Sequence, residues 1–371
     1  MAIRVLVVDD SVVVRRLVTR VLEEESDVEV VGVAANGRIA LAKLGQLEVD
    51  VVTLDIEMPE MDGLATLAEL RPRYPRLPVI MFSTLTERGA EATLEALSLG
   101  ASDYVTKPTG LHNPTEALAA VKAELLPRIR ALHGRTAAAT PAAPPAPAPV
   151  PAPAPAGPAV TAPVVRPANA RIDVVAIGVS TGGPNALADL LPALPSSLPV
   201  PVVIVQHMPP VFTKMLANRL DSRCTLDVVE ANGGEVLAPG RIYIAAGGRH
   251  LALVRQGTSV LTVANDDPPE NSCRPAVDVL FRSVASLYGT GALAVVLPGM
   301  GQDGLRGAEA IRLSGGQILA QDEASSVVWG MPGFVARAEL ADAVLPLNAL
   351  AADIGRRVAA GRPLPVPGRV A

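Results

Sequence analysis

The 371-residue sequence contains little cysteine and very few aromatic side chains. Its two cysteines, Cys224 and Cys273, are too few and too far apart for a disulfide framework or a thiolate metal cage, so both are expected to be reduced thiols. Aromatic residues make up 2% of the chain, whereas 49% of its residues are hydrophobic, so Val, Leu, Ile and Ala must fill the core. Such a composition is typical of parallel sheets that are buried on both faces.

Long apolar runs and basic clusters are also missing. No stretch approaches the roughly 20 apolar residues that a membrane-spanning helix needs, and the short apolar start of the chain ends in acid at Asp9, unlike a signal peptide. The formal net charge is −5, and no basic face is available for nucleic acid. The sequence therefore predicts a cytoplasmic protein with no nucleic-acid partner and no direct membrane insertion, and it disfavours a DNA-binding output domain.

Proline, by contrast, is abundant and concentrated in the middle of the chain. Residues 134–170 consist mostly of Ala, Pro, Val and Thr with almost no charge, which favours an extended spacer over a packed core. The length of the chain also indicates two domains. We therefore expect a first domain over residues 1–133, a Pro/Ala-rich linker over 134–170 and a second domain over 171–361.

Short β-branched runs alternate with helical patterns on both sides of the linker. The strands expected in the first domain are Val5–Val8, Val28–Ala34, Val49–Leu54, Val79–Phe82 and Asp103–Val105. Those expected in the second are Ile172–Val179, Val202–Gln206, Arg241–Ile244, Ala292–Leu297 and Ile318–Gln321, with an amphipathic helix over Pro275–Tyr288. The alternation predicts an α/β protein with two doubly wound parallel-sheet domains.

Polar residues stand where the strands of the first domain end. They are Asp9 and Asp10 after the first strand, Asp55 after the third, Ser83 after the fourth and Lys107 just after the fifth. Because the carboxyl ends of parallel strands meet at one edge of a sheet, these side chains are expected to converge. Three carboxylates suit Mg²⁺, while a lysine and a hydroxyl can bind a phosphoryl group on an aspartate. Each residue alone fits a solvated or helix-capping role, but together the five favour a phosphorylation site.

With these motifs, residues 1–130 resemble the receiver domain of response regulators. The matching residues are Asp9, Asp10, Asp55, Gly63, Ser83, Lys107 and Pro108. The resemblance implies a flavodoxin-like fold in which Asp55 accepts phosphate from a histidine kinase at a Mg²⁺ site formed by the three carboxylates. It also implies that Ser83 and Tyr104 form the conformational switch, with Lys107 beside the phosphate.

A serine, a histidine and an aspartate follow strands of the second domain. Ser180 lies in a G-x-S-x-G pattern over residues 178–182, which is typical of a nucleophile on a tight strand-to-helix turn. His207 ends the next strand and can act as base and then as acid, and Asp303 can orient it. The order Ser, His, Asp is not that of α/β-hydrolases, so that fold is not implied. A structural or phosphate-binding turn and a structural histidine stay open for the single residues.

The loop over residues 299–304 supports a second interpretation. It reads G-x-G-x-x-G, and Asp322 and Glu323 follow about twenty residues on, as in a dinucleotide-binding fingerprint. However, Asp303 would place a negative charge near the pyrophosphate, and the fingerprint leaves the serine and the histidine without a role. We therefore favour the hydrolytic interpretation.

Residues 171–361 resemble the catalytic domain of the chemotaxis-type protein-glutamate methylesterases. The motifs that carry the resemblance lie at 177–183, 206–209, 274–281, 299–304 and 320–332. It implies a Rossmann-like hydrolase without a cofactor, in which Ser180 attacks the methyl ester of a receptor glutamate, His207 is the base and Asp303 orients His207. Backbone N–H groups of Thr181 and Met300 would stabilise the oxyanion. Deamidation of receptor glutamines is the same acyl chemistry, so chemoreceptors and a histidine kinase are the expected partners.

Two positions and the order of the domains add to this interpretation. Pro298 stands where the family usually has threonine, and Arg274 either lines the substrate groove or is an exposed or capping arginine. The domain order suggests that the unphosphorylated receiver covers the Ser180 cleft and that phosphorylation of Asp55 shifts it away. An adaptor protein with an idle triad is the alternative.

Overall fold

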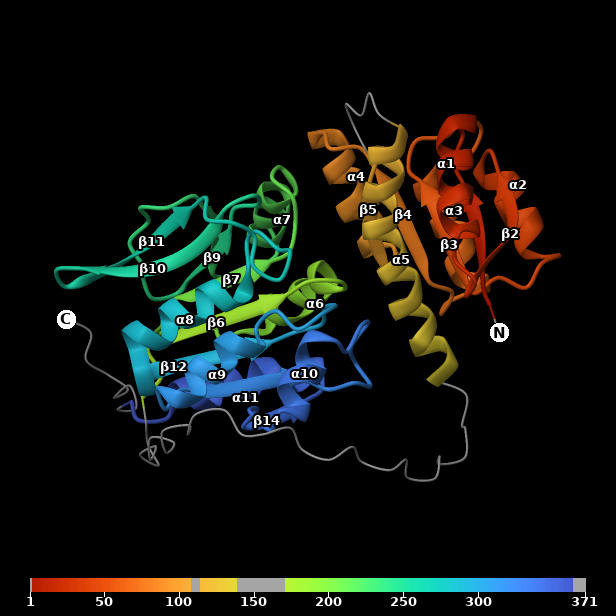
Figure 1. Ribbon diagram of the computed structural model, residues 1–371. Coiled ribbons are helices and arrows are strands. Elements are labelled where there is room, and N and C mark those ends of the chain that lie inside the picture. The colour runs from red at the N-terminus through yellow and green to blue at the C-terminus, as the bar shows by residue number, and fades with distance from the viewer. Residues whose placement is uncertain (1, 108–113, 139–170, 363–371) are drawn as a thin grey trace.

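A computed structural model describes residues 2–107, 114–138 and 171–362. The first unit is a five-stranded parallel sheet in the order β2-β1-β3-β4-β5 (Figure 1). Its strands are β1 (Ile3–Val8), β2 (Val28–Ala34), β3 (Val51–Asp55), β4 (Val79–Ser83) and β5 (Asp103–Thr106). Its helices are α1 (Val12–Glu23), α2 (Gly37–Leu44), α3 (Gly63–Arg73), α4 (Glu87–Ser98) and α5 (Pro114–Ala138). The predicted doubly wound sheet is confirmed, with strand ends that differ by one or two residues.

Burial and helix capping explain why polar residues gather at one edge of this sheet. Every residue of β3 and β4 is buried, as expected for strands covered on both faces. Side-chain oxygens that accept backbone N–H bonds begin the helices that follow, which satisfies donors that a helix leaves free. These N-caps are Ser11, Asn36, Asp62 and Thr86 for α1 to α4. Each strand therefore ends in a short polar turn at the same edge.

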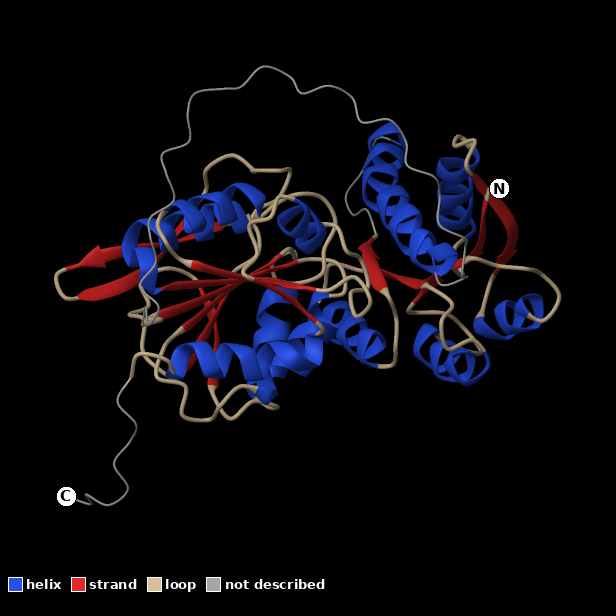
Figure 2. Ribbon diagram, turned by 90° about the horizontal axis from the view of Figure 1, so that it is seen from below, coloured by secondary structure: helices blue, strands red, loops and turns tan. Residues whose placement is uncertain are grey.

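The second unit is a seven-stranded parallel sheet in the order β14-β13-β12-β6-β7-β9-β8. Its strands are β6 (Val174–Val179), β7 (Val202–Gln206), β8 (Asp227–Ala231), β9 (Arg241–Ala245), β12 (Ala292–Val296), β13 (Gln317–Gln321) and β14 (Ala343–Leu345). Its helices are α6 (Gly183–Leu190), α7 (Phe212–Asp221), α8 (Val277–Tyr288), α9 (Leu305–Leu313), α10 (Met331–Arg337) and α11 (Leu347–Ala359), with 3₁₀ turns at Leu191–Ala193 and Gly289–Gly291. Helices cover both faces of the sheet (Figure 2). The predicted α/β class is confirmed here too.

Several elements of the second unit do not follow from the sequence patterns. The edge strands β8 and β14 have mixed burial, so their apolar signal is weak. An antiparallel hairpin, β10 (His250–Gln256) and β11 (Ser259–Asn265), stands apart from the parallel sheet. In the first unit, α5 continues to Ala138, five residues into the predicted linker, and the rest of that linker, 139–170, lies outside the described residues. No helix among the described residues is long and apolar enough to cross a membrane.

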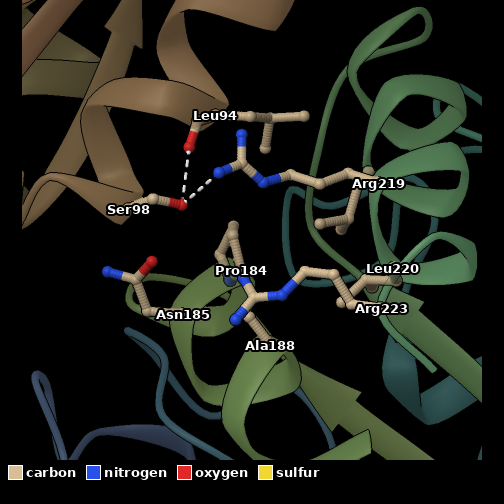
Figure 3. A pocket seen from close by; sticks show the side chains of 9 residues that line it. Leu94, Ser98, Pro184, Asn185, Ala188, Arg219, Leu220 and Arg223 are labelled. Atoms are coloured by element: carbon tan, nitrogen blue, oxygen red, sulfur yellow. Dashed lines mark hydrogen bonds between the residues drawn. The ribbon is translucent and has the colours of Figure 1, made fainter. Parts of the chain in front are cut away.

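The two units pack against each other through α4, β5 and α5 of the first. One continuous apolar cluster contains Leu94 and Leu97 of α4 together with Ala186 of α6 and Leu216 of α7. Figure 3 shows this junction, where α4 faces α6 and α7 around a small cavity of about 10 Å³, room for about one water. The contact lies next to the first turn of α6, which directly follows the predicted nucleophile.

Candidate active site and phosphorylation site

The carboxylates of Asp9, Asp10 and Asp55 converge at the carboxyl ends of β1 and β3. One oxygen from each lies within 4.8 Å of the others. Lys107, predicted to join them, has its Nζ 2.7 Å from Asp55 Oδ2 and 3.0 Å from Asp9 Oδ2. Because β1 lies between β2 and β3, the cluster stands at the point where the strand order reverses, the usual ligand site of such sheets. Beside it, Asp10 lines an open groove of about 670 Å³.

The cluster holds more negative charge than its single lysine neutralises. Burial raises the pKa of Asp55 to about 6, and Asp9 adds to this, whereas Lys107 opposes it. Burial also lowers the pKa of Lys107, but its bonds to Asp55 and Asp9 outweigh that effect and raise it. A divalent cation among oxygen-only ligands would offset the remaining repulsion, so the donor set fits a hard cation such as Mg²⁺.

The two predicted switch residues contact partners other than Asp55. The Ser83 hydroxyl donates to Gly89 O at 3.0 Å and accepts from Thr93 Oγ1 at 2.7 Å, so it is bonded to α4. Tyr104 is buried, and its ring stacks on Phe212 of α7 with centroids 5.0 Å apart. The switch positions therefore connect β4 to α4 and β5 to the second unit.

Ser180 lies directly after β6, at the point where the order of the second sheet reverses between β12 and β7. Gly182, the N-cap of α6, has φ of +79°, a conformation that favours glycine, and Pro184 stands in the first turn of the helix. Across the site, the N–H of Ser180 donates to Pro298 O at 2.9 Å. A Cβ on Gly299 would lie 2.7 Å from Ser180 Cβ, so only glycine allows this loop to approach.

His207 and Asp303 form a hydrogen-bonded pair, with Nε2 and Oδ2 2.7 Å apart. Asp303 Oδ2 also accepts from Val277 N at 2.7 Å, and its Oδ1 accepts from Asp278 N at 3.0 Å. These two N–H groups open α8, whose positive dipole end therefore faces the carboxylate. Burial would raise the pKa of Asp303, but these hydrogen bonds outweigh it and lower the pKa.

The imidazole is biased toward its protonated form. Burial lowers the pKa of His207, but the hydrogen bond to Asp303 and the neighbouring thiol of Cys273 outweigh burial and raise it to about 9. Because Asp303 occupies Nε2, the partners assign the proton to that nitrogen and leave Nδ1 as the basic position. Within the described residues the Ser180 hydroxyl makes no hydrogen bond to His207, whose Nδ1 instead lies 3.5 Å from Cys273 Sγ.

Two backbone N–H groups beside Ser180 have no acceptor in the part of the chain that the structure describes. Neither Thr181 N nor Met300 N donates to a protein acceptor within the described residues. Both lie in the loops that flank Ser180, so they are available to donate hydrogen bonds to an oxyanion formed at that residue. Gln206 ties the two strand ends together, since its Nε2 donates to Ser180 O at 3.0 Å and to His207 O at 3.1 Å.

The loop over 299–304 is not arranged for a dinucleotide. Asp278, fully buried in α8, accepts from Gly304 N at 3.0 Å and from Gly307 N at 2.6 Å, so N–H groups at the start of α9 already have a carboxylate partner. Arg274 donates to Asp266 O and Asp267 O, a structural contact. Sequence patterns did not single out Asp278, because an acid in the first helical turn is an ordinary cap.

Three further contacts connect the first unit to the surroundings of Ser180. The Thr181 hydroxyl donates to the Asp103 carboxylate at 2.8 Å. Asn185 Nδ2 donates to Leu97 O at 2.9 Å, and Arg219 Nη2 donates to Ser98 Oγ at 2.5 Å, the bond drawn in Figure 3. In addition, Val328 of the second unit belongs to an apolar cluster with buried residues of the first unit, and Met300 and Val327 pack against that cluster.

Fold and sites together define a response regulator in which a receiver unit precedes an α/β output unit. Two family models match the chain: a response regulator receiver domain at residues 5–119 and a CheB methylesterase domain at 175–354. The protein-glutamate methylesterase/protein-glutamine glutaminase of Trichodesmium erythraeum is 52% identical over 96% of this chain and 99% of its own. That of a Nocardioides species is 51% identical over 98% of each chain.

The CheB methylesterase catalytic domain of Thermotoga maritima is a similar solved structure. It is 43% identical and covers 50% of this chain and 98% of its own, with a TM-score of 0.49. On the identity and coverage of the full-length relatives, the chain belongs to the family of protein-glutamate methylesterases/protein-glutamine glutaminases.

Proposed function

We propose that the protein is a phosphorylation-regulated serine hydrolase that removes methyl groups from glutamate methyl esters of chemoreceptors and deamidates receptor glutamines. The observation that carries the proposal is the His207–Asp303 pair beside Ser180, in a chain whose full-length relatives bear both activities in their names. The N–H groups of Thr181 and Met300, which donate to no acceptor among the described residues, add support.

In the proposed reaction, Ser180 Oγ attacks the ester carbonyl while His207 Nδ1 takes the hydroxyl proton. Asp303 holds the imidazole and stabilises its charge. The N–H groups of Thr181 and Met300 stabilise the oxyanion, His207 returns the proton to methoxide, and methanol leaves. Water then attacks the acyl-enzyme by the same route and frees the glutamate carboxylate. An amide substrate loses ammonia in place of methanol.

Because Ser180 and His207 are not hydrogen-bonded, we propose that the described conformation is a resting one. The contacts of Asp103 with Thr181 and of Tyr104 with Phe212 support a receiver that is docked on the site. Phosphorylation of Asp55 would weaken this docking, with Ser83 and Tyr104 as the switch and Lys107 bound to the phosphate. The proposed domains are the receiver at 1–133, the linker at 134–170 and the hydrolase at 171–361.

For phosphorylation, Asp9, Asp10 and Asp55 would hold Mg²⁺, which fits their converging oxygens. When bound, the cation would offset the negative charge between the incoming phosphoryl group and the carboxylates. A chemotaxis-type histidine kinase is the proposed phosphodonor, and the chemistry of such a kinase makes the cytoplasm the proposed location. Hydrolysis itself requires no cofactor in this scheme.

The test is methanol release from methylated receptor membranes by the full chain, with and without a small phosphodonor and Mg²⁺. We expect release that rises with the phosphodonor, vanishes in Ser180→Ala and loses its stimulation in Asp55→Asn. Ammonia release from membranes with unmodified receptor glutamines tests the second activity. No release under any condition, with receptors from the matching organism, would instead favour an adaptor protein with an idle triad.

A further inference from the structure

A tight turn over Glu270–Cys273 lies against the histidine–aspartate pair. The N–H of Glu270 donates to Cys273 O at 3.1 Å, and the N–H of Cys273 donates to Glu270 O at 2.8 Å. The two central residues, Asn271 and Ser272, have φ of 52° and 62°. Positive φ at both positions is the signature of a two-residue hairpin turn that favours Asn and Gly. The turn therefore has a defined conformation.

This turn is anchored to the helix that also binds Asp303. The two terminal guanidinium nitrogens of Arg282 in α8 donate to the carboxylate of Glu270, Nη1 to Oε1 at 2.7 Å and Nη2 to Oε2 at 2.6 Å, a bidentate pair of fixed geometry. The first N–H groups of the same helix donate to Asp303. Helix α8 therefore binds both the turn and Asp303 and fixes their positions relative to each other.

From the turn, the side chain of Asn271 reaches two carboxylates. Its Nδ2 donates to Asp303 Oδ1 at 3.1 Å and to Asp278 Oδ2 at 2.9 Å. The amide has two N–H donors, and one carboxylate takes each. Since two buried carboxylates repel each other, a donor between them favours one orientation of Asp303.

Cys273, at the end of the turn, contacts the other side of the pair. Its Sγ lies 3.5 Å from Nδ1 of His207, while Asp303 binds Nε2 of the same ring. The imidazole therefore lies between a residue of the turn and the acid that the turn also contacts.

We propose that Asn271 and Cys273, two residues of the Glu270–Cys273 turn, are positioning residues of the hydrolytic reaction. Asn271 holds Asp303 in the orientation in which it binds His207, and Cys273 limits the movement of the ring. The kinetic consequence of this inference rests on the proposed hydrolase function. The alignment of His207 with Asp303 does not depend on that function and can be measured separately. Asn271 is exposed at the surface, so the loss of its amide leaves the core intact.

The experiment compares Asn271→Gly with Ser272→Gly in the phosphorylated full chain. Glycine accepts the positive φ at both positions, so both variants keep the turn, and only the first loses the bridging amide. We expect Asn271→Gly to lower kcat roughly 10- to 100-fold with KM nearly unchanged, as misplacement of a reacting group does. Ser272→Gly should match the unaltered chain in activity and melting temperature, whereas Asn271→Gly should melt several degrees lower but still in one cooperative transition, because two bonds to buried carboxylates are lost. A normal kcat, or a loss seen only in KM, in Asn271→Gly overturns the proposal.

A spectroscopic measurement tests the positioning independently of ester hydrolysis. The Nε2 proton of His207, bonded to Asp303, should give a downfield proton NMR signal that is assigned by its loss in Asp303→Asn. The signal should persist in Ser272→Gly and broaden or disappear in Asn271→Gly. An unchanged signal in Asn271→Gly overturns the inference even if the chain hydrolyses no ester, whereas failure of Ser180→Ala to abolish methanol release bears only on the proposed function.

Discussion

The carboxylate of Asp103 accepts a 2.8 Å hydrogen bond from the hydroxyl of Thr181, the residue that follows Ser180. Asp103 is 5% exposed, and its other side-chain partner is Arg128 of α5 at 3.0 Å. Burial raises the pKa of Asp103, and Arg128 and Thr181 oppose this shift. A charged group of the receiver therefore depends on a hydroxyl beside the proposed nucleophile for one of its few partners.

Thr181→Val should raise hydrolysis by the unphosphorylated chain. The substitution keeps the shape and the backbone N–H but removes the donor to a buried carboxylate, a bond on the order of 1.5–3 kcal/mol, so undocking should become roughly 10- to 100-fold more favourable. The measurement is basal methanol release without phosphodonor. Thr181→Ser, which keeps the hydroxyl, is the matched control and should stay at the low basal rate. Equal basal rates in the two variants would show that the hydrogen bond between Thr181 and Asp103 does not hold the receiver on the site.

Hydrolysis should increase with pH up to about 9. The pKa of His207 is raised to about 9, so the neutral imidazole that can accept the Ser180 proton becomes abundant only near that pH. The stabilising contribution of the protonated His207–Asp303 pair is present in full below pH ~6.5, the ordinary pKa of histidine, and is lost as the pH rises through 9. A profile of kcat/KM that is already flat from pH 6 would contradict this.

A Cys273→Ser variant tests the origin of the high pKa. The thiol is one of the groups that raise the pKa of His207, together with Asp303, so its removal should move the midpoint of the same profile to lower pH. Asp278, the other nearby acid, is unchanged in this variant. A midpoint that does not move would assign the shift to Asp303 alone.

Asp55→Asn should stabilise the first unit while it abolishes phosphorylation. The pKa of Asp55 is raised to about 6, so ionisation of this buried acid disfavours folding above that pH, and an amide removes the penalty. We expect a melting temperature higher by a few degrees at pH 8 and nearly unchanged at pH 4. Phosphoryl incorporation from a small phosphodonor should stop in this variant and, in the unaltered chain, on chelation of Mg²⁺. A larger gain in melting temperature at pH 4 than at pH 8 would contradict this prediction.

Gly299→Ala should inactivate the hydrolase without unfolding it. A Cβ at this position would lie 2.7 Å from Ser180 Cβ and 2.3 Å from the flexible Met331 sulfur, so Ser180 or the loop must shift. Activity should fall at least about 100-fold, as expected for a displacement of the nucleophile by ~1 Å. The control is Gly45→Ala, where the nearest atom to a Cβ is 3.5 Å away. Equal activity of both variants would show that the loop can adapt.

The local sequence was sufficient for the fold class and for the sheet edges at which most of the candidate site residues gather. Buried strands are short apolar runs, and parallel sheets align their carboxyl ends, so residues far apart in sequence such as Asp9 and Asp55 could be predicted to meet. The same rule predicted that Ser180, His207 and Asp303 share one edge, and the structure brings His207 and Asp303 to 2.7 Å.

Tertiary structure alone decided which partner each side chain has. The contact between Asp103 and Thr181 joins residues 78 positions apart in different units, and no periodicity encodes how the two units pack. Asn271 reaches Asp303 because a turn with positive φ directs its amide toward the start of α8. Amino-acid composition does not predict that direction. Sequence patterns thus specify which edge of a sheet a residue occupies, because strand and helix periods are local. Hydrogen bonds across that edge depend on distances of a few tenths of an ångström, which packing sets.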